Sequence, residues 1–302
     1  MTEEVKPFRV LSLDGGGIRG LFTAAFLAHI EEQAKKPLSS CFDLIVGTST
    51  GGIIALAIGS GIRACDVLRF YLEEGKSIFS KARPWPIRLM RPKYDAEPLY
   101  EALKKFLGTA TMNDSKTKLC ITSYESVEGT PRVIKTDHAE GLHWGGEQLM
   151  WKVGAATSAA PTYFPAFQIS THDSHLDGGV WANNPVHVGI AEAIYRLGQR
   201  LDNLAILSVG TGSKRFTLSY TEASRRGLIQ WVRPSFDLLI GSQSFAAHHS
   251  AKFLLDSGTY IRIDIDLAEP VALDDYEESL PLVERGYQAG RIHRDMIAKN
   301  FC

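Results

Sequence analysis

The first 60 residues alternate twice between a short apolar run and a longer run whose apolar residues repeat at helical spacing. Residues 8–13 (FRVLSL) and 42–46 (FDLIV) are apolar and partly β-branched, which favours strands. A helical pattern follows each of them, over residues 17–33 and from residue 51 to 59. Such alternation predicts parallel strands joined by right-handed crossovers, with helices on both faces of the sheet. We therefore expect an α/β fold.

The alternation continues through the rest of the 302 residues without a linker or a repeat. Further strands are expected at residues 118–124, 131–136, 204–210 and 259–265, and further helices at 65–76, 96–107, 146–158, 186–197, 236–256 and 282–299. Since α/β folds of this length often form one unit, we expect residues 1–302 to make a single domain.

Composition and charge limit the classes of protein to which this chain can belong. With 44% hydrophobic and 22% charged residues and a formal charge of −1, the chain has material for a packed core and no global attraction to nucleic acid or anionic lipid. The N-terminus, MTEEVKPFRV, is acidic where a signal peptide would be basic, and no run reaches the ~18 apolar residues of a membrane span. We expect a cytoplasmic protein without a DNA or RNA polymer as partner.

The four cysteines lie far apart in the sequence and form no C-x-x-C pair. They are Cys41, Cys65, Cys120 and Cys302. Their spacing fits neither a zinc site nor a disulfide framework. We therefore expect four reduced thiols and no metal.

Ser49 stands between glycines at the junction of the second predicted strand and its helix. Residues 47–51 read GTSTG, so the serine occupies the centre of a G-x-S-x-G motif. A strand that reverses sharply into a helix strains its turn residue and needs small neighbours. The turn projects the serine oxygen at a helix N-terminus, where free N–H groups favour developing negative charge. The alternative is a small-residue turn that only permits close helix packing.

A second glycine cluster, LDGGGIRG (13–20), follows the first strand. Gly15, Gly17 and Gly20 stand in G-x-G-x-x-G register, which a dinucleotide site would share. That site needs an acidic residue at the end of the second strand, where this chain has VGTSTG, and no P-loop lysine follows. Backbone N–H donors for an oxyanion formed at the serine suit the cluster better. Arg19 adds a cation for a phosphate or carboxylate, or forms a surface ion pair.

A nucleophilic serine needs a base, and none of the nine histidines lies in an evident motif. The segment HLDGGVWANNPV (175–186) instead places Asp177 before two glycines and another helix. A carboxylate at this turn could accept the serine proton directly. The alternative is an ordinary Asp-Gly turn.

Together these segments resemble the patatin-like phospholipases. DGGGIRG (14–20), GTSTG (47–51), DGG (177–179) and NNP (183–185) occur in the family's order, and the resemblance covers residues 8–212. It implies a three-layer α/β fold with a mainly parallel central sheet, and leaves residues 213–302 as a C-terminal extension packed on the catalytic core. The motif positions that support it are Asp14, Arg19, Gly20, Gly47, Thr50, Gly51, Gly178 and Gly179.

The resemblance implies hydrolysis of a lipid acyl ester without a cofactor or a metal. By position in the motifs, Ser49 resembles the family's nucleophile, Asp177 its general base, and Gly15, Gly16 and Gly17 its oxyanion donors. The sequence forms look like those of bacterial members, some of which degrade membranes in cyclic-oligonucleotide antiphage signalling. A phospholipid membrane as substrate and a cyclic di- or trinucleotide as activator are therefore expected, while the oligomeric state stays open.

Residues 81–93 (KARPWPIRLMRPK), which we call the basic loop, carry five basic residues and no acidic one. Three prolines keep most of this loop from forming a regular helix. Its cations alternate with apolar residues, so it could dock on an anionic bilayer or grip a nucleotide phosphate while an aromatic ring stacks on a base. A solvated loop whose apolar residues pack on the body is the alternative. The candidate contacts are Lys81, Arg83, Trp85, Arg88, Arg91 and Lys93.

Two other functions compete with the lipid hydrolase. A Ser–His–Asp esterase would share the serine turn and take its histidine late in the chain, from His248, His249 or His293. A non-catalytic module would bind a nucleotide or a partner and keep the glycines for packing. Neither explains the Asp177 turn.

Overall fold

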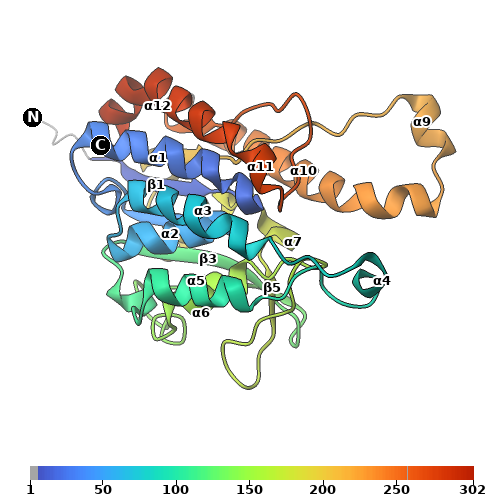
Figure 1. Ribbon diagram of the computed structural model, residues 1–302. Helices are drawn as coiled ribbons and strands as arrows, with labels where there is room; N and C mark the ends of the chain where they lie inside the picture. Colours follow the sequence, from blue (N-terminus) through green and yellow to red (C-terminus); the bar gives the residue numbers. More distant parts are fainter. Residues whose placement is uncertain (1–5, 257) are drawn as a thin grey trace, which may run out of the picture.

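A computed structural model describes residues 6–256 and 258–302 (Figure 1). The expectation that no signal peptide is present was drawn from residues 1–10, and residues 1–5 of that segment lie outside the described residues. Seven strands form one sheet: β1 (Phe8–Leu13), β2 (Leu44–Gly47), β3 (Lys118–Glu125), β4 (Thr130–Lys135), β5 (His175–Asp177), β6 (Leu204–Val209) and β7 (Tyr260–Ile263).

The sheet order is β4-β3-β2-β1-β6-β7, with β5 paired to β3. β1, β2, β3, β6 and β7 run parallel, whereas β4 and β5 are antiparallel to β3. The predicted α/β fold with a mainly parallel sheet is confirmed, and all six predicted strands are present. β5 was not predicted, because three residues are too few to display an alternating pattern.

Alternate residues of each central strand enter two different cores. Val10 and Leu44 pack in one core, whereas Leu11 and Ile45 pack in the other. This is the period-two geometry of a strand buried on both faces. The larger core lies beneath α1 (Gly20–Ala34), α2 (Thr50–Ser60), α3 (Ala64–Ile78), α5 (Glu97–Leu107), α6 (Met150–Thr157) and α12 (Pro281–Asn300). The smaller core lies beneath α8 (Val186–Tyr195) and the end of α10 (Leu228–Leu254).

All eight predicted helices occur, and α10 is longer than expected. It begins at Leu228, before Pro234, whereas the sequence pattern predicted a start at residue 236. Pro234 removes a single helical hydrogen bond, in a part of the helix that projects from the body in Figure 1. The short helices α4 (Trp85–Arg88), α7 (Gly179–Ala182), α9 (Tyr220–Arg225) and α11 (Tyr276–Ser279) complete the fold.

The cysteine prediction was wrong for one pair. Cys41 and Cys302 form a disulfide, while Cys65 and Cys120 are free. The two bonded residues are 261 positions apart, so spacing along the chain gave no indication of the pairing. They meet because α12 packs along α1 and brings the C-terminus back to the start of β2, where the Phe42 and Phe301 rings are in contact.

The helices of the described part of the chain were compared with what a membrane span requires. No helix there combines the length and the apolar character needed to cross a bilayer.

Candidate active site

Ser49 occupies the sharp turn between β2 and α2. It is a non-glycine residue with φ 52° and ψ −122°, a strained combination found where the surrounding structure imposes it. The flanking glycines leave no room for side chains. A Cβ at Gly51 would lie 2.3 Å from the Leu13 carbonyl oxygen, and a Cβ at Gly47 would lie 2.4 Å from that of Gly51. The crossing of β1, β2 and α2 thus requires the predicted small residues and fixes the serine at the helix N-terminus.

The backbone of Ser49 is held by a side chain that the sequence did not reveal. Thr157, the last residue of α6, accepts a 2.9 Å hydrogen bond from the Ser49 N–H through Oγ1 and donates from the same atom to the Thr122 carbonyl at 2.6 Å. Thr157 therefore ties the serine turn to β3. The Ser49 side chain lies in a largely buried position, with 9% of the residue exposed.

Asp177 ends β5 and faces the serine. It is 5% exposed, and burial raises the pKa of its carboxyl to about 6. Interaction with the Ser49 hydroxyl opposes this rise, as does a 2.7 Å hydrogen bond from the Gly179 N–H. No ion pair to Asp177 occurs among residues 6–256 and 258–302. A buried carboxyl with this pKa is ionised at neutral pH and remains a competent proton acceptor.

The end of α6 also positions the Asp177 turn. The Asp177 N–H donates to the Ala159 carbonyl at 3.0 Å, and the Gly178 N–H donates to that of Thr157 at 3.2 Å. Thr157, the last residue of α6, and Ala159, two residues further on, thus hold both the serine turn and the aspartate turn. The end of α6 therefore sets the relative position of Ser49 and Asp177.

The glycine loop after β1 passes directly beside the serine. A Cβ at Gly15 would lie 3.3 Å from the Ser49 Cβ and 2.4 Å from the Asn183 side-chain oxygen, so only glycine fits. The Gly15 N–H already donates to the Asn183 carbonyl at 2.9 Å. Gly16 and Gly17 both line the cavity at Ser49, and Gly17 has a φ of 58°, which glycine adopts without strain.

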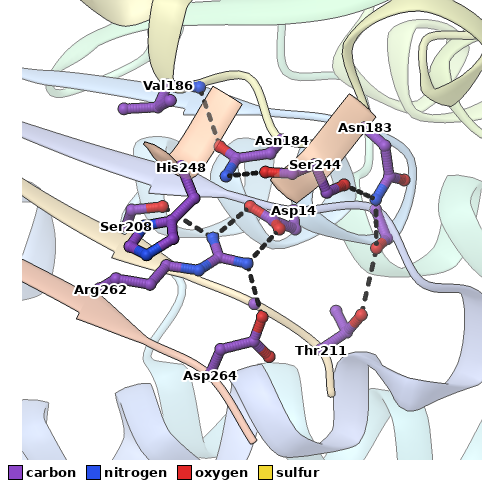
Figure 2. Close-up of polar contacts among 12 residues, drawn as sticks. Asp14, Asn183, Asn184, Val186, Ser208, Thr211, Ser244, His248, Arg262 and Asp264 are labelled. Carbon is purple, nitrogen blue, oxygen red and sulfur yellow. Dashed lines mark hydrogen bonds and ion pairs between the residues drawn. The ribbon is translucent and has the colours of Figure 1, made fainter. Parts of the chain in front are cut away.

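Arg262 of β7 anchors the glycine loop from behind (Figure 2). Its guanidinium donates two hydrogen bonds to the Asp14 carboxylate, at 2.9 and 2.6 Å, and others to Ser208 at 2.8 Å and Asp264 at 2.7 Å. Burial alone would lower the pKa of Arg262, but the Asp14 and Asp264 carboxylates raise it well above its usual value. Burial raises the pKa of the Asp14 carboxyl to about 6 against the opposing effect of Arg262, so the pair is ionised at neutral pH. It is bidentate, the strongest geometry for an arginine and a carboxylate.

Helix α10 reaches the same loop through Asn183, as Figure 2 shows. The Asn183 N–H donates to the Gln243 side-chain oxygen at 2.8 Å, and its side-chain amide donates to the Ser244 hydroxyl at 2.9 Å. Asn183 in turn accepts from Gly15, as described above. A displacement of α10 would therefore move Asn183 and, through it, the glycine loop.

Ser49 and Asp177 open onto one largely apolar pocket. Arg19 contributes a cation to its wall, and burial lowers the pKa of that guanidinium. The apolar lining comes from α2, α3, α5, α10 and the segment after α6. It includes Ile53, Phe70, Tyr71, Ile78, Phe79, Leu99, Tyr163, Phe164, Phe236 and Ile240. A pocket with one reactive polar corner and an apolar remainder fits the acyl chain of a lipid.

A comparison with known families agrees with this geometry. The family model described as "Patatin-like phospholipase" matches residues 11–190, more than half of the chain. The chain belongs to the patatin-like phospholipase family. The family resemblance, the fold and the assignment to the lipid acyl hydrolases are thereby confirmed.

Bacterial relatives cover most of this patatin-like chain. A "cGAMP-activated phospholipase" of Pseudomonas aeruginosa is 34% identical over 272 residues, which are 88% of this chain and 80% of the relative. One of Vibrio cholerae is 31% identical over 297 residues, 88% of this chain and 84% of the relative. Among solved structures, VipD from Legionella pneumophila has a TM-score of 0.47 at 12% identity and covers 93% of this chain and 67% of VipD.

The structure brings most of the predicted motif residues of this patatin-like chain together. Ser49, Asp177, Gly16, Gly17, Arg19, Thr50 and Gly179 line the same pocket. Asp14 and Gly15 lie behind it, whereas Gly20, Gly47, Gly51 and Gly178 serve close packing. The predicted contacts of the basic loop, from Lys81 to Lys93, do not line the pocket.

The histidines of the competing esterase lie elsewhere. No histidine in residues 6–256 and 258–302 lines the pocket at Ser49. His248 instead contacts the Tyr260 hydroxyl at 2.9 Å through Nδ1, and His249 packs against Phe245. His293 lies in α12. The geometry thus favours the aspartate over a histidine as the base.

One group of residues with metal-ligand chemistry lies apart from the pocket. Cys120, His138 and Glu192 have ligand atoms within 4.8 Å of one another. The Glu192 carboxylate is paired with the Lys135 ammonium and with His138 Nε2, the latter at 3.0 Å. Because these two groups satisfy the carboxylate, the cluster is explained as a buried ion-pair network beneath α8.

Proposed function

We propose that the protein hydrolyses acyl ester bonds of membrane phospholipids with a Ser49–Asp177 dyad. The observation that carries this proposal is the strained Ser49 turn, whose hydroxyl interacts with a buried carboxylate that forms no ion pair, at the polar corner of an apolar pocket. Ser49 Oγ attacks the ester carbonyl carbon while Asp177 takes the hydroxyl proton. Asp177 then returns that proton to the departing alkoxide, which leaves as the lysolipid.

The second half of the reaction uses the same groups. Water, deprotonated by Asp177, attacks the acyl-serine carbonyl, and the fatty acid leaves as Ser49 regains its proton. Of the three predicted oxyanion donors, Gly15 has its N–H engaged by Asn183, so we assign the oxyanion to the N–H groups of Gly16 and Gly17. The Arg19 guanidinium in the pocket wall is the candidate partner for a lipid phosphate.

A cyclic di- or trinucleotide is the activator that we propose. The relatives of Pseudomonas aeruginosa and Vibrio cholerae are named cGAMP-activated phospholipases, and they share about a third of their residues with this chain over most of its length. A phospholipase that works only on such a signal suits an antiviral role, in which it would degrade the membrane of the host cell. No cofactor or metal enters the proposed reaction.

The basic loop is the membrane contact that we propose. Trp85 is 70% exposed, Leu89 69% and Met90 91%, so these apolar side chains do not pack on the body of the protein. Phe79, two residues before the start of the loop, lines the pocket. Apolar side chains among cations at a pocket mouth suit peripheral binding to an anionic bilayer. A nucleotide phosphate is the alternative ligand for the same cations.

We further propose that the chain acts as one domain on the cytoplasmic face of the membrane. Residues 8–212 would be the catalytic core and residues 213–302 an extension packed on it; the pairing of β7 with β6 and the contact of α12 with α1 support this. In the reducing cytoplasm the Cys41–Cys302 disulfide would open. The proposal therefore requires a fold that persists with both thiols reduced.

The test is fatty-acid release from mixed phospholipid vesicles by the wild type, Ser49→Ala and the control Ser40→Ala. Ser40 is exposed and lies outside the pocket lining. Each protein is assayed with and without a panel of cyclic di- and trinucleotides. Release by the wild type and Ser40→Ala, but not by Ser49→Ala, would support the dyad, and dependence on one nucleotide would support the activator. No release under any condition would contradict the proposed reaction and favour a binding module.

A further inference from the structure

Residues 214–233, which we call the basic arm, form a second strongly basic segment. They contain five Lys or Arg residues and one acidic residue, in a chain whose formal charge is −1. The basic arm comprises α9, its flanking loops and the start of α10, and it projects from the body in Figure 1. Like the basic loop, it concentrates positive charge on a protein that is nearly neutral overall.

Two cations of the basic arm form no salt bridge, although Arg226 is close enough to the exposed Glu222 carboxylate to act on it electrostatically. No ion pair to Arg225 or Arg226 occurs among residues 6–256 and 258–302. The Arg226 guanidinium instead lies 5.7 Å from the ring centroids of both Phe216 and Trp231. Unpaired cations next to aromatic rings remain available to an anionic partner.

The basic arm also exposes large apolar side chains. Tyr220 is 88% exposed and Leu228 82% exposed. Among the arm residues whose side chains the structure describes, none lines the catalytic pocket. Small ligands are held in concave sites, whereas cations interspersed with exposed aromatic and aliphatic residues on a projecting segment match the interface of a bilayer.

Both basic segments adjoin the mouth of the catalytic pocket. Phe79, which lines the pocket, lies two residues before the basic loop, and Phe236, which also lines it, lies three residues after the end of the basic arm. In Figure 1 the α4 loop and the arm project beyond the same end of the sheet. An anionic surface that contacts both segments would therefore face the pocket entrance.

We propose that the basic arm is a second contact with an anionic phospholipid bilayer, and that it seats the pocket on the membrane together with the basic loop. This inference rests on the proposed lipid hydrolysis, which gives the reason for binding a membrane. The charge and exposure of the basic arm, which are its evidence, do not depend on that reaction. The two segments bind on either side of the pocket, so a lipid can enter without leaving the interface. Charge complementarity selects anionic vesicles over neutral ones.

The experiment measures the partition of the full chain onto vesicles by flotation. All proteins carry Ser49→Ala, so that the vesicles stay intact. The arm variant is Arg225→Gln/Arg226→Gln, and the matched control is Arg291→Gln/Arg294→Gln, which removes the same charge from exposed arginines of α12. The vesicles are pure phosphatidylcholine or contain about one third phosphatidylglycerol, with and without a cyclic dinucleotide.

The arm variant should bind anionic vesicles about 25-fold more weakly than its parent, because each basic residue near such a surface contributes about fivefold. The control should stay within about twofold, and added salt should abolish the difference between the proteins by screening the charges. A second variant, Leu228→Ser, replaces an exposed side chain without disturbing the core and should also weaken binding.

Three results would overturn the proposal: equal binding of neutral and anionic vesicles, unchanged partition of both arm variants, or an equal loss in the control. A loss of cyclic dinucleotide binding in the arm variant, with partition unchanged, would overturn it in favour of a nucleotide site. Hydrolysis of a soluble short-chain ester by the wild type is measured separately. Failure of the membrane proposal is thereby distinguished from failure of the proposed reaction.

Discussion

Asp14 and Asp177 are both buried carboxylates that end or follow a strand of the sheet, yet their surroundings differ. Asp14 is 3% exposed and is held by two hydrogen bonds from the Arg262 guanidinium. Asp177 is 5% exposed and receives only neutral donors, the Ser49 hydroxyl and the Gly179 N–H. Burial raises the pKa of both carboxyls to about 6. The Arg262 guanidinium engages both oxygens of Asp14 as an anchor, whereas Asp177 has no such partner and can exchange a proton with Ser49.

The contrast separates two tasks that one active site must combine. The glycine loop has to be rigid, because an oxyanion site works only when its donors are already in place. The base has to change its protonation state during each turnover. Asp14, which is held by Arg262, keeps the glycine loop rigid. Asp177, which no cation in the described residues contacts, transfers the proton.

The largest effect is expected from exchanging each carboxylate for its amide. Asp177→Asn should lower kcat/KM on a soluble ester by at least about 10³-fold, because the amide cannot accept the serine proton. Asp14→Asn should lower it by only about 10- to 100-fold, because the glycine loop is loosened while the dyad stays intact. Steady-state kinetics of both variants measure the difference, and equal losses would contradict the division of tasks.

The same two variants should change stability in opposite directions. The pKa of Asp177 rises from 3.8 to about 6 on folding, so the stability associated with its protonated form is present below pH 3.8 and is lost as the pH rises through about 6. Asp177→Asn should therefore raise the free energy of unfolding at pH 7 by up to about 3 kcal/mol.

Burial raises the pKa of Asp14 to about 6 as well, but Asp14→Asn also removes a counter-ion of the buried Arg262. Because an uncompensated buried charge costs more than the carboxylate's own burial, this variant should lower the free energy of unfolding by about 3 kcal/mol. Urea unfolding at pH 7 and at pH 4 measures both changes. The gain in Asp177→Asn should vanish at pH 4, and a gain that persists there would show that packing rather than charge causes it.

Arg262 is expected to act as a positioning residue. Arg262→Met should lower kcat by about 10- to 100-fold and change KM by less than about twofold, because the lost clamp disturbs the glycine loop and not the apolar pocket. Arg262→Lys, which keeps the charge but not the bidentate geometry, should recover part of kcat. A purely structural role would lower the folded fraction and leave the kcat of the remaining folded enzyme unchanged.

The motifs predicted the part of the site that is local in sequence. Ser49 and the glycine loop each lie at a strand–helix junction within a few residues of the chain, so small residues and apolar runs define them. Asp177 was predicted from its turn, although β5 was not. These positions are recognisable because the backbone geometry restricts which residues fit there.

The supporting contacts could not be predicted, because they join distant positions through ordinary residues. Thr157 binds the Ser49 N–H across 108 positions, and Arg262 reaches Asp14 across 248. A single threonine at a helix end or arginine in a strand has no pattern that marks it. The Cys41–Cys302 disulfide, across 261 positions, was missed for the same reason. Tertiary packing alone brings these pairs together.

The smallest effect is expected in the pH profile, and it tests which carboxylate titrates. Asp177 must be ionised to accept the serine proton, so kcat/KM should fall about tenfold per pH unit below about pH 6 and level off above it. Asp14→Asn should lower the whole profile and leave this acidic limb where it is, because the clamped carboxylate does not take part in proton transfer. A limb that disappears in Asp14→Asn would reverse the roles of the two carboxylates, and a limb near pH 4 would show that the Asp177 site is more hydrated than its 5% exposure indicates.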